Sequence, residues 1–171
     1  MRYCAVIDTN VLVSAMLKWN SVPGTVMALA FDGPITPILS KEILTEYREV
    51  LSRPKFRFTE EIVRDILESM TEAGMILDAE QMDIELPDPK DRVFYEVVME
   101  GRRREDAYLI TGNLRHFPSE PFIVTPRQML DIVSLSFSGA MVCIRTLPSS
   151  MRATVSRFVI SLDIRIVSDW M

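Results

Sequence analysis

Apolar residues along this chain occur either in short continuous runs or in stripes with helical spacing. The continuous runs lie at residues 3–7, 35–39, 108–111 and 122–125. Runs of this length are typical of strands buried on both faces, whereas apolar residues spaced three or four apart are typical of amphipathic helices. The two patterns alternate along the chain, and we therefore expect an α/β fold.

Capping residues and helix breakers mark the ends of the predicted helices. Ser40 is an N-cap before one apolar stripe, which Pro54 closes, and Thr59 with the two glutamates after it starts another. Pro37 makes the run at 35–39 a poor strand, because proline cannot donate to a sheet ladder. The predicted helices span residues 11–17, 25–31, 41–51, 58–74 and 127–133, and one more begins within 88–94.

The net charge, the length of the apolar runs and the cysteine content limit which partners and which location we expect for this protein. The chain has 171 residues and a formal net charge of −5, which argues against a general surface for polyanions. A protein of this charge that handles nucleic acid needs a local basic patch or a metal ion. No apolar run is long enough to span a membrane. The two cysteines, Cys4 and Cys143, have no metal or redox spacing, so we expect reduced thiols and a cytoplasmic location.

Three carboxylates lie where a site could form. Asp8 directly follows the first strand, and the carboxyl edge of an open α/β sheet is where ligands and metals bind. Glu46 flanks the apolar stripe of residues 41–51, and Asp91 lies on the apolar side of the next helix start. Each also has an ordinary explanation, since Glu46 could be a surface residue and Asp88 and Asp91 could cap a helix.

Other polar features carry less information. His116 is the only histidine, and without a paired nucleophile nearby in sequence it has little support as a catalytic base. The arginines at 102–104 are ordinarily solvated surface, with phosphate contact as the alternative.

Four segments together resemble the signature motifs of PIN-domain nucleases. They are residues 7–14, 44–51, 88–91 and 108–113, in the order that the family shows, and the resemblance covers about residues 1–134. Among PIN proteins the resemblance is strongest to the VapC-like ribonucleases, the toxin components of bacterial and archaeal toxin–antitoxin systems.

The resemblance implies a fold and a site. The fold is a three-layer α/β arrangement with a central parallel sheet flanked by helices. Asp8, Glu46 and Asp91 match the family's three main acidic positions. The family's fourth position, often Asp, falls on Asn113, which brings no charge. Asp106 is displaced by one residue from the family pattern, which on a strand reverses its face.

These residue types suit Mg²⁺ or Mn²⁺, because hard cations prefer oxygen ligands and keep several waters. Asp8 and Asp91 are the first candidates for direct ligands, and Glu46 would hold a second ion or orient the attacking water. Without metal, the crowded carboxylates should have raised pKa values. Asp88 and Asn113 are further candidate ligands, and Thr9, Asn10 and Thr111 are candidates for hydrogen bonds to the ligands.

The resemblance therefore predicts a metal-dependent ribonuclease, the toxin of a type II toxin–antitoxin pair. Its partners would be RNA, a cognate antitoxin and a second copy of the chain in a homodimer. One alternative is a degenerate PIN domain that binds RNA or a protein without cleavage. Another is a phosphatase or nucleotide-binding protein, although the chain lacks a phosphate-binding glycine loop and a second Asp two residues after Asp8.

Residues 135–171 lie outside the resemblance, and we treat them as a C-terminal extension of unknown role. Apolar and mostly polar residues alternate over 158–167, which is a strand pattern with one apolar face. Such a strand needs a sheet edge or a partner to cover it.

Overall fold

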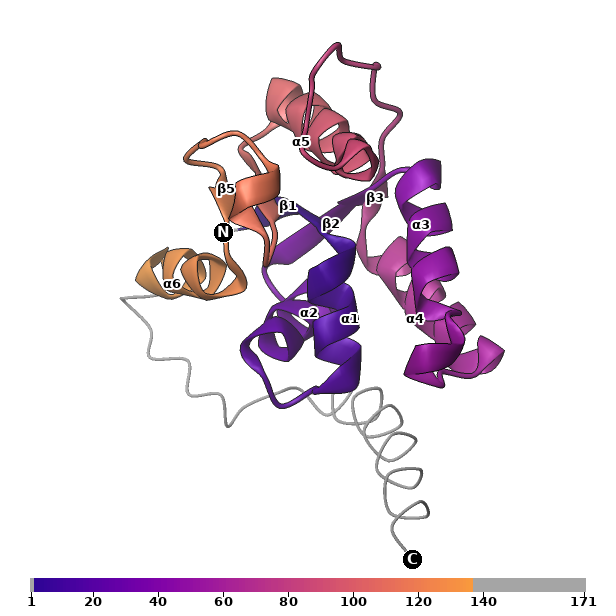
Figure 1. Cartoon of the computed structure of the whole chain (residues 1–171). Helices are drawn as coiled ribbons and strands as arrows, with labels where there is room; N and C mark the ends of the chain where they lie inside the picture. Colours follow the sequence, from indigo (N-terminus) through magenta and orange to yellow (C-terminus); the bar gives the residue numbers. More distant parts are fainter. Residues whose placement is uncertain (1, 137–171) are drawn as a thin grey trace, which may run out of the picture. The chain divides into compact units, whose positions relative to one another are not determined.

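A parallel sheet of five strands forms the centre of the computed structural model, which describes residues 2–136 (Figure 1). The strand order is β3-β2-β1-β4-β5 and every neighbouring pair is parallel. The strands are β1 (Tyr3–Ile7), β2 (Ile35–Leu39), β3 (Met75–Ile76), β4 (Ala107–Ile110) and β5 (Ile123–Val124).

Helices fill the connections between these strands. The α-helices are α1 (Thr9–Leu17), α2 (Val22–Asp32), α3 (Lys41–Leu51), α4 (Glu60–Ala73), α5 (Arg92–Arg104) and α6 (Pro126–Ser136). Three short 3-10 helices are η1 (Pro54–Phe56), η2 (Pro89–Asp91) and η3 (Leu114–His116). The predicted fold class, a parallel sheet flanked by helices, is confirmed.

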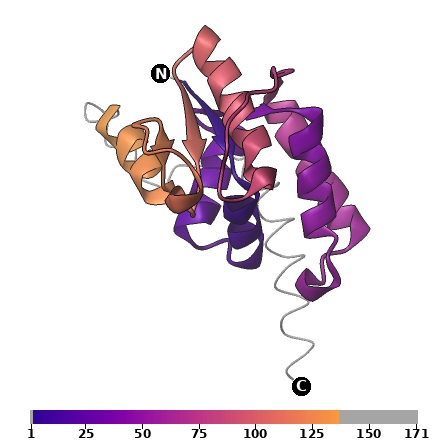
Figure 2. The same ribbon diagram turned by 45° about the horizontal axis from the view of Figure 1, so that its top comes forward.

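The strand order places the helices in two layers. The chain moves from β1 through β2 to β3 toward one edge, and then returns across the sheet to β4 on the other side of β1. Because such crossovers are right-handed, the helices before β3 and the helix after it lie on opposite faces. α2 and α4 accordingly pack on β2, whereas α5 packs on β1, β2 and β4. α3 lies beside α4 and also contacts α5 (Figure 2).

The hydrophobic core follows from the continuous apolar runs. Every residue of β1 is buried, as expected for a central parallel strand covered by helices on both faces. Tyr47 of α3 and Phe94 of α5 are the largest fully buried side chains, and their rings lie 6.4 Å apart. Gly101 lets α5 approach the sheet, because a Cβ there would lie 2.7 Å from the Ile38 side chain.

Several predicted boundaries were wrong for local reasons. α1 begins at Thr9 instead of residue 11, because the Asp8 side chain accepts from the Asn10 backbone N–H and caps the helix. α2 begins at Val22 instead of residue 25, because Ser21 caps it. β2 is an inner strand in spite of Pro37, which lies where pairing with β1 ends and one residue before pairing with β3 begins.

Two further sequence predictions concern residues that the structure does not describe. Both Cys143 and the strand predicted at 158–167 lie outside the described residues. Cys4 is a buried free cysteine. Within residues 2–136, no helix is long and apolar enough to cross a membrane.

Candidate functional site

From β1 the chain adds β2 and β3 on one side, and then continues with β4 on the other side of β1. The order of the strands thus switches between β1 and β4, and the loops that follow these two strands meet at this switch point. Asp8 follows β1 and Thr111 follows β4, and both are buried. The Thr111 hydroxyl donates to Asp8 Oδ2 at 2.6 Å. In open α/β sheets the crevice at such a switch point is the usual ligand site. Asp8 therefore lies at the position where this fold is expected to bind a ligand.

Asn10 fixes the Asp8 carboxylate and ties the two loops together. Its backbone N–H donates to Asp8 Oδ1 at 3.1 Å and its side-chain amide donates to Asp8 Oδ2 at 2.5 Å. Its own Oδ1 accepts from the Gly112 N–H at 2.9 Å. A Cβ on Gly112 would lie 3.0 Å from this oxygen, so glycine permits the close approach of the β4 loop.

Glu46 comes to the same edge of the sheet from α3. The Thr9 hydroxyl donates to Glu46 Oε1 at 2.8 Å, and the Glu46 side chain is half-buried. The neighbouring Tyr47 hydroxyl donates to the Ile7 carbonyl oxygen at the end of β1. This second contact anchors α3 to the last residue of the central strand, and thereby sets the position of Glu46.

Asp91 is the last residue of η2 and precedes α5 directly. It occupies the N-cap position of α5 without making a capping hydrogen bond, so its carboxylate is available elsewhere. His116 Nδ1 lies 2.7 Å from Asp91 Oδ2, and Asn113 Nδ2 lies 2.9 Å from His116 Nε2. The three side chains form a polar chain that runs from the β4 loop to η2.

The electrostatics of the three carboxylates reflect burial and mutual repulsion. Burial is the largest cause that raises the pKa of Asp8, Glu46 and Asp91. The charge of Asp91 raises the pKa of Asp8 further, and the charges of Asp8 and Asp91 raise that of Glu46. The raised pKa values were predicted, but from repulsion alone, whereas desolvation contributes more.

Hydrogen bonds oppose these shifts in each case. The Thr111 and Asn10 donors lower the pKa of Asp8, the Thr9 hydroxyl lowers that of Glu46, and His116 lowers that of Asp91. Each carboxylate therefore has a donor of its own from the protein.

The three carboxylates are chemically suited to bind a hard divalent ion, because such ions prefer oxygen ligands. Within residues 2–136, however, no three Asp, Glu, His or Cys side chains are grouped closely enough to hold one ion together. Mg²⁺ commonly takes one or two carboxylates and keeps several waters. The three carboxylates therefore suit an ion that one or two of them would bind directly, while the remaining carboxylate would contact it through a water molecule.

The two additional candidate ligands make other hydrogen bonds in this structure. Asp88 Oδ1 accepts from the Lys90 N–H at 3.0 Å and caps η2, so the predicted capping role is confirmed for this short helix, while α5 begins later, at Arg92. The Asn113 side chain contacts His116, and its backbone N–H donates to the Thr111 hydroxyl.

Asp106 and the arginine run lie at the opposite edge of the sheet. Asp106 precedes β4, so it stands at the amino end of that strand and away from Asp8. Arg103 and Arg104 form ion pairs with Glu100, and Arg102 donates to the Ala107 carbonyl oxygen. Phosphate contact by these arginines at the Asp8 site is thus not supported.

His116 is the residue of this region that the sequence pattern missed. It lies 25 positions from Asp91, and no spacing links the two. The only signal in the sequence was its place shortly after the strand of residues 108–111.

Comparisons with known proteins are consistent with the fold described above. The sequence profile of the PIN domain matches residues 4–115. An uncharacterised protein of Methanocaldococcus jannaschii is 31% identical over 111 residues, which cover 63% of this chain and 69% of that protein. No solved structure matches the chain at a significant level.

Proposed function

Because this chain belongs to the PIN-domain family, whose members are generally nucleases that use divalent metal ions, we propose that it is a metal-dependent ribonuclease. The observation that carries the proposal is the arrival of Asp8, Glu46 and Asp91 from three separate segments at the carboxyl edge of β1. Carboxylates that repel one another at a site partly shielded from water are stabilised by a cation, and the family uses one.

In this proposal Asp8 and Asp91 would hold Mg²⁺ or Mn²⁺, and Glu46 would orient the attacking water or hold a second ion. A divalent ion supplies Lewis-acid activation of water and neutralises charge on the phosphate. The protein contributes fixed orientation. Asn10 and Thr111 hold the Asp8 carboxylate on both oxygens, and Thr9 holds Glu46.

His116 is a positioning residue for Asp91 in this proposal. Its ring nitrogen contacts one carboxylate oxygen and leaves the other oxygen of Asp91 for the ion. Asn113, where many family members carry Asp, braces His116 from its far side. Asn113 brings no charge to the site, but through His116 it would help to fix the orientation of the Asp91 carboxylate.

We further propose a biological setting on the strength of the four motifs. The chain would be the toxin of a type II toxin–antitoxin pair, acting in the cytoplasm on RNA, as a homodimer held in check by an antitoxin. Residues 1–134 would form the nuclease domain and residues 135–171 an extension to it. Growth arrest on expression in a bacterial host, relieved by the product of an adjacent short gene, would support this setting.

A cleavage assay on a defined RNA tests the enzymatic proposal. The wild-type chain should cut the RNA with Mn²⁺ or Mg²⁺ and stop when EDTA is added. Asp8→Asn should abolish cutting, while Asp65→Asn, an exposed change on α4, should not. Equal cutting by rigorously purified wild-type and Asp8→Asn protein would refute the assignment.

A second candidate is a PIN domain that binds RNA without cutting it. Asn113 in place of an acid, and the absence of a close three-ligand group within residues 2–136, favour this candidate. RNA binding that needs no metal, together with no cleavage by wild-type protein, would identify it.

A further inference from the structure

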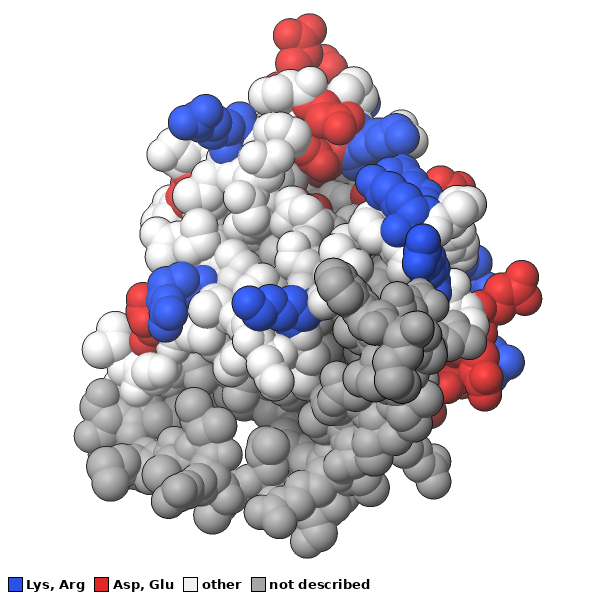
Figure 3. Space-filling model, turned by 60° about the horizontal axis from the view of Figure 1, so that its bottom comes forward, with Lys and Arg blue, Asp and Glu red and all other residues white. Residues whose placement is uncertain are grey.

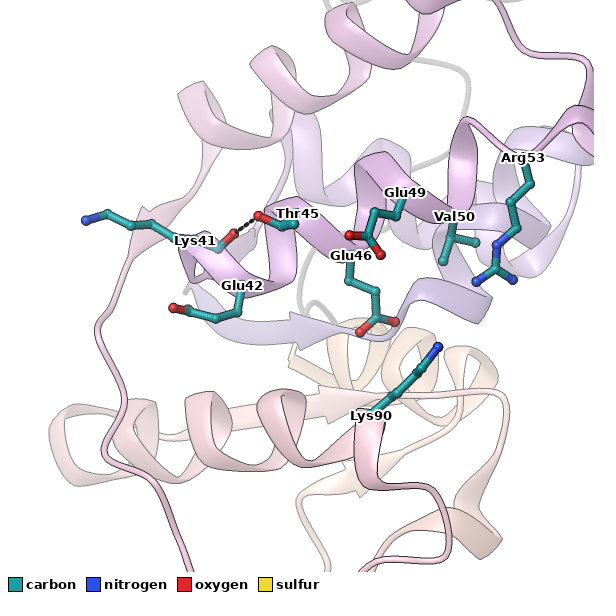
Figure 4. Close-up of a pocket in the computed structure, with 8 residues that line it drawn as sticks. All are labelled: Lys41, Glu42, Thr45, Glu46, Glu49, Val50, Arg53 and Lys90. Carbon is teal, nitrogen blue, oxygen red and sulfur yellow. Dashed lines mark hydrogen bonds between the residues drawn. The ribbon is translucent and has the colours of Figure 1, made fainter.

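A pocket of about 380 Å³ lies along the outer side of α3 and opens beside the proposed catalytic carboxylates. We call it the α3 pocket (Figure 4). All but one of its lining residues lie on a single stripe of α3 and the turn after it, and the other comes from η2. The lining residues are Lys41, Glu42, Thr45, Glu46, Glu49, Val50, Arg53 and Lys90.

Glu46 belongs both to the α3 pocket and to the acidic site. It therefore joins the two spaces, so a group bound in the pocket lies next to whatever is bound by Asp8 and Asp91. In Figure 4 the side chains of Lys90 and Arg53 extend toward the space beside Glu46, whereas Lys41 and Glu42 point away from it. Beside Glu46, the pocket thus combines the positive charges of Lys90 and Arg53 with the carboxylate that also belongs to the acidic site.

Neither of these two cations is held in an ion pair in the part of the chain that the structure describes, although the charge of Lys90 also acts on Glu46 and lowers its pKa against the effect of burial. Arg53 and Lys90 are both exposed. By contrast, Arg103 and Arg104 at the end of α5 are both paired with Glu100. Figure 3 also shows Lys and Arg side chains gathered in a row along one side of a face, although the net charge of the chain is −5.

We propose that the α3 pocket binds the nucleotide adjacent to the cleaved phosphodiester bond, with Arg53 and Lys90 contacting its phosphate. The identity of this ligand rests on the ribonuclease proposal. Arginine and lysine are the usual phosphate-binding side chains, and unpaired cations beside an acidic site offset its repulsion of a polyanion. The volume of the pocket falls in the range of sites that enclose organic ligands, and is more than a lone phosphate needs.

Binding of a short fluorescein-labelled oligouridylate in EDTA, followed by anisotropy over a range of salt concentrations, tests this proposal without requiring catalysis. For single strands, each phosphate contact contributes about 0.7 to the slope of log K against log salt. Because Arg53 and Lys90 contact one phosphate in this proposal, Arg53→Gln with Lys90→Gln should make the slope less negative by about 0.7 and weaken binding about 5-fold at about 0.1 M salt. Glu49→Gln removes a carboxylate from the pocket wall and should tighten binding.

The matched control is Lys18→Gln with Arg64→Gln, which removes the same two charges from exposed positions on other elements. It should bind nearly as the wild type does. We call the double variant Arg53→Gln with Lys90→Gln the pocket variant. If the pocket variant binds like this control, or if wild-type protein does not bind the oligouridylate, the proposal is overturned.

The same proteins, assayed for cleavage with Mn²⁺, separate this inference from the ribonuclease proposal. If wild-type protein cleaves RNA and the pocket variant binds as well as the wild type, the proposed role of the α3 pocket is refuted and the ribonuclease proposal stands. Loss of binding in the pocket variant, with no cleavage by wild-type protein, would support the pocket and refute the ribonuclease.

Discussion

The hydrogen bond from Thr111 to Asp8 makes a quantitative test of the site possible. Thr111→Val keeps the shape of the side chain and removes the hydroxyl that donates to Asp8 Oδ2 at 2.6 Å. Thr111 is fully buried and Asp8 is 4% exposed, so water cannot readily replace the donor. A hydrogen bond to a charged group contributes about 1.5–3 kcal/mol, and we expect the variant to lose this amount in free energy of unfolding at neutral pH. The hydrogen bond from the Asn113 N–H to the same hydroxyl is lost as well, which adds a smaller loss that does not depend on the ionisation of Asp8.

The loss should depend on pH in a defined direction. Burial already raises the pKa of Asp8 in the folded protein, so ionised Asp8 destabilises the fold at neutral pH, and this penalty disappears as the pH falls through the folded pKa. The Thr111 donor opposes that rise, and its removal raises the pKa of Asp8 further. The loss of stability in Thr111→Val should therefore shrink at low pH toward about 0.5–1.5 kcal/mol for each of the two neutral hydrogen bonds that the hydroxyl makes.

Urea unfolding in EDTA at several pH values measures this deficit. Thr71→Val is the matched control, because the Thr71 hydroxyl donates to the Leu67 carbonyl oxygen and no carboxylate is involved. Its deficit should not change with pH in the acidic range. If Thr111→Val shows no deficit at neutral pH, or one as independent of pH as the control, the proposed coupling between Thr111 and ionised Asp8 is refuted.

Three further predictions concern other contacts. His116→Ala should weaken Mn²⁺ binding about tenfold in calorimetric titration, because it releases Asp91, and unchanged affinity would remove its positioning role. Tyr47→Phe should lower the free energy of unfolding in urea by about 1–3 kcal/mol, because a buried carbonyl oxygen of β1 loses its donor. Gly101→Ala should cost about 1 kcal/mol and retain metal-dependent cleavage, because crowding against the Ile38 terminal methyl and the Ala107 Cβ is partly offset by the better helix propensity of alanine. Full stability in urea would show that Ile38 or α5 moves aside.

The sequence by itself determined the local elements and the fold class. The central strand Tyr3–Ile7 was predicted because a continuous apolar run has no polar face to present to water. α3 was predicted over its full length, and Ser40 caps it by accepting from the Ile43 N–H. These features depend on residues within one or two turns of each other, so the sequence pattern contains the relevant interactions.

The candidate site was only partly accessible from the sequence. Asp8 could be located because the residue after a buried parallel strand must lie at the carboxyl edge of the sheet. Glu46 and Asp91 were ambiguous from spacing alone, since a surface role or a capping role explained each of them. The order of the four motifs favoured a common site. The pairing of each carboxylate with its own donor became visible only in the folded chain.

Only the tertiary structure decided which distant segments meet. Pro37 argued against a strand, but the register of β2 between β1 and β3 accommodates it, and register depends on pairing across the sheet. His116 gained its place beside Asp91 because β4 returns next to β1, which carries the loop after β4 toward η2. The strand order that makes this return possible is a property of long-range packing, and no local periodicity encodes it.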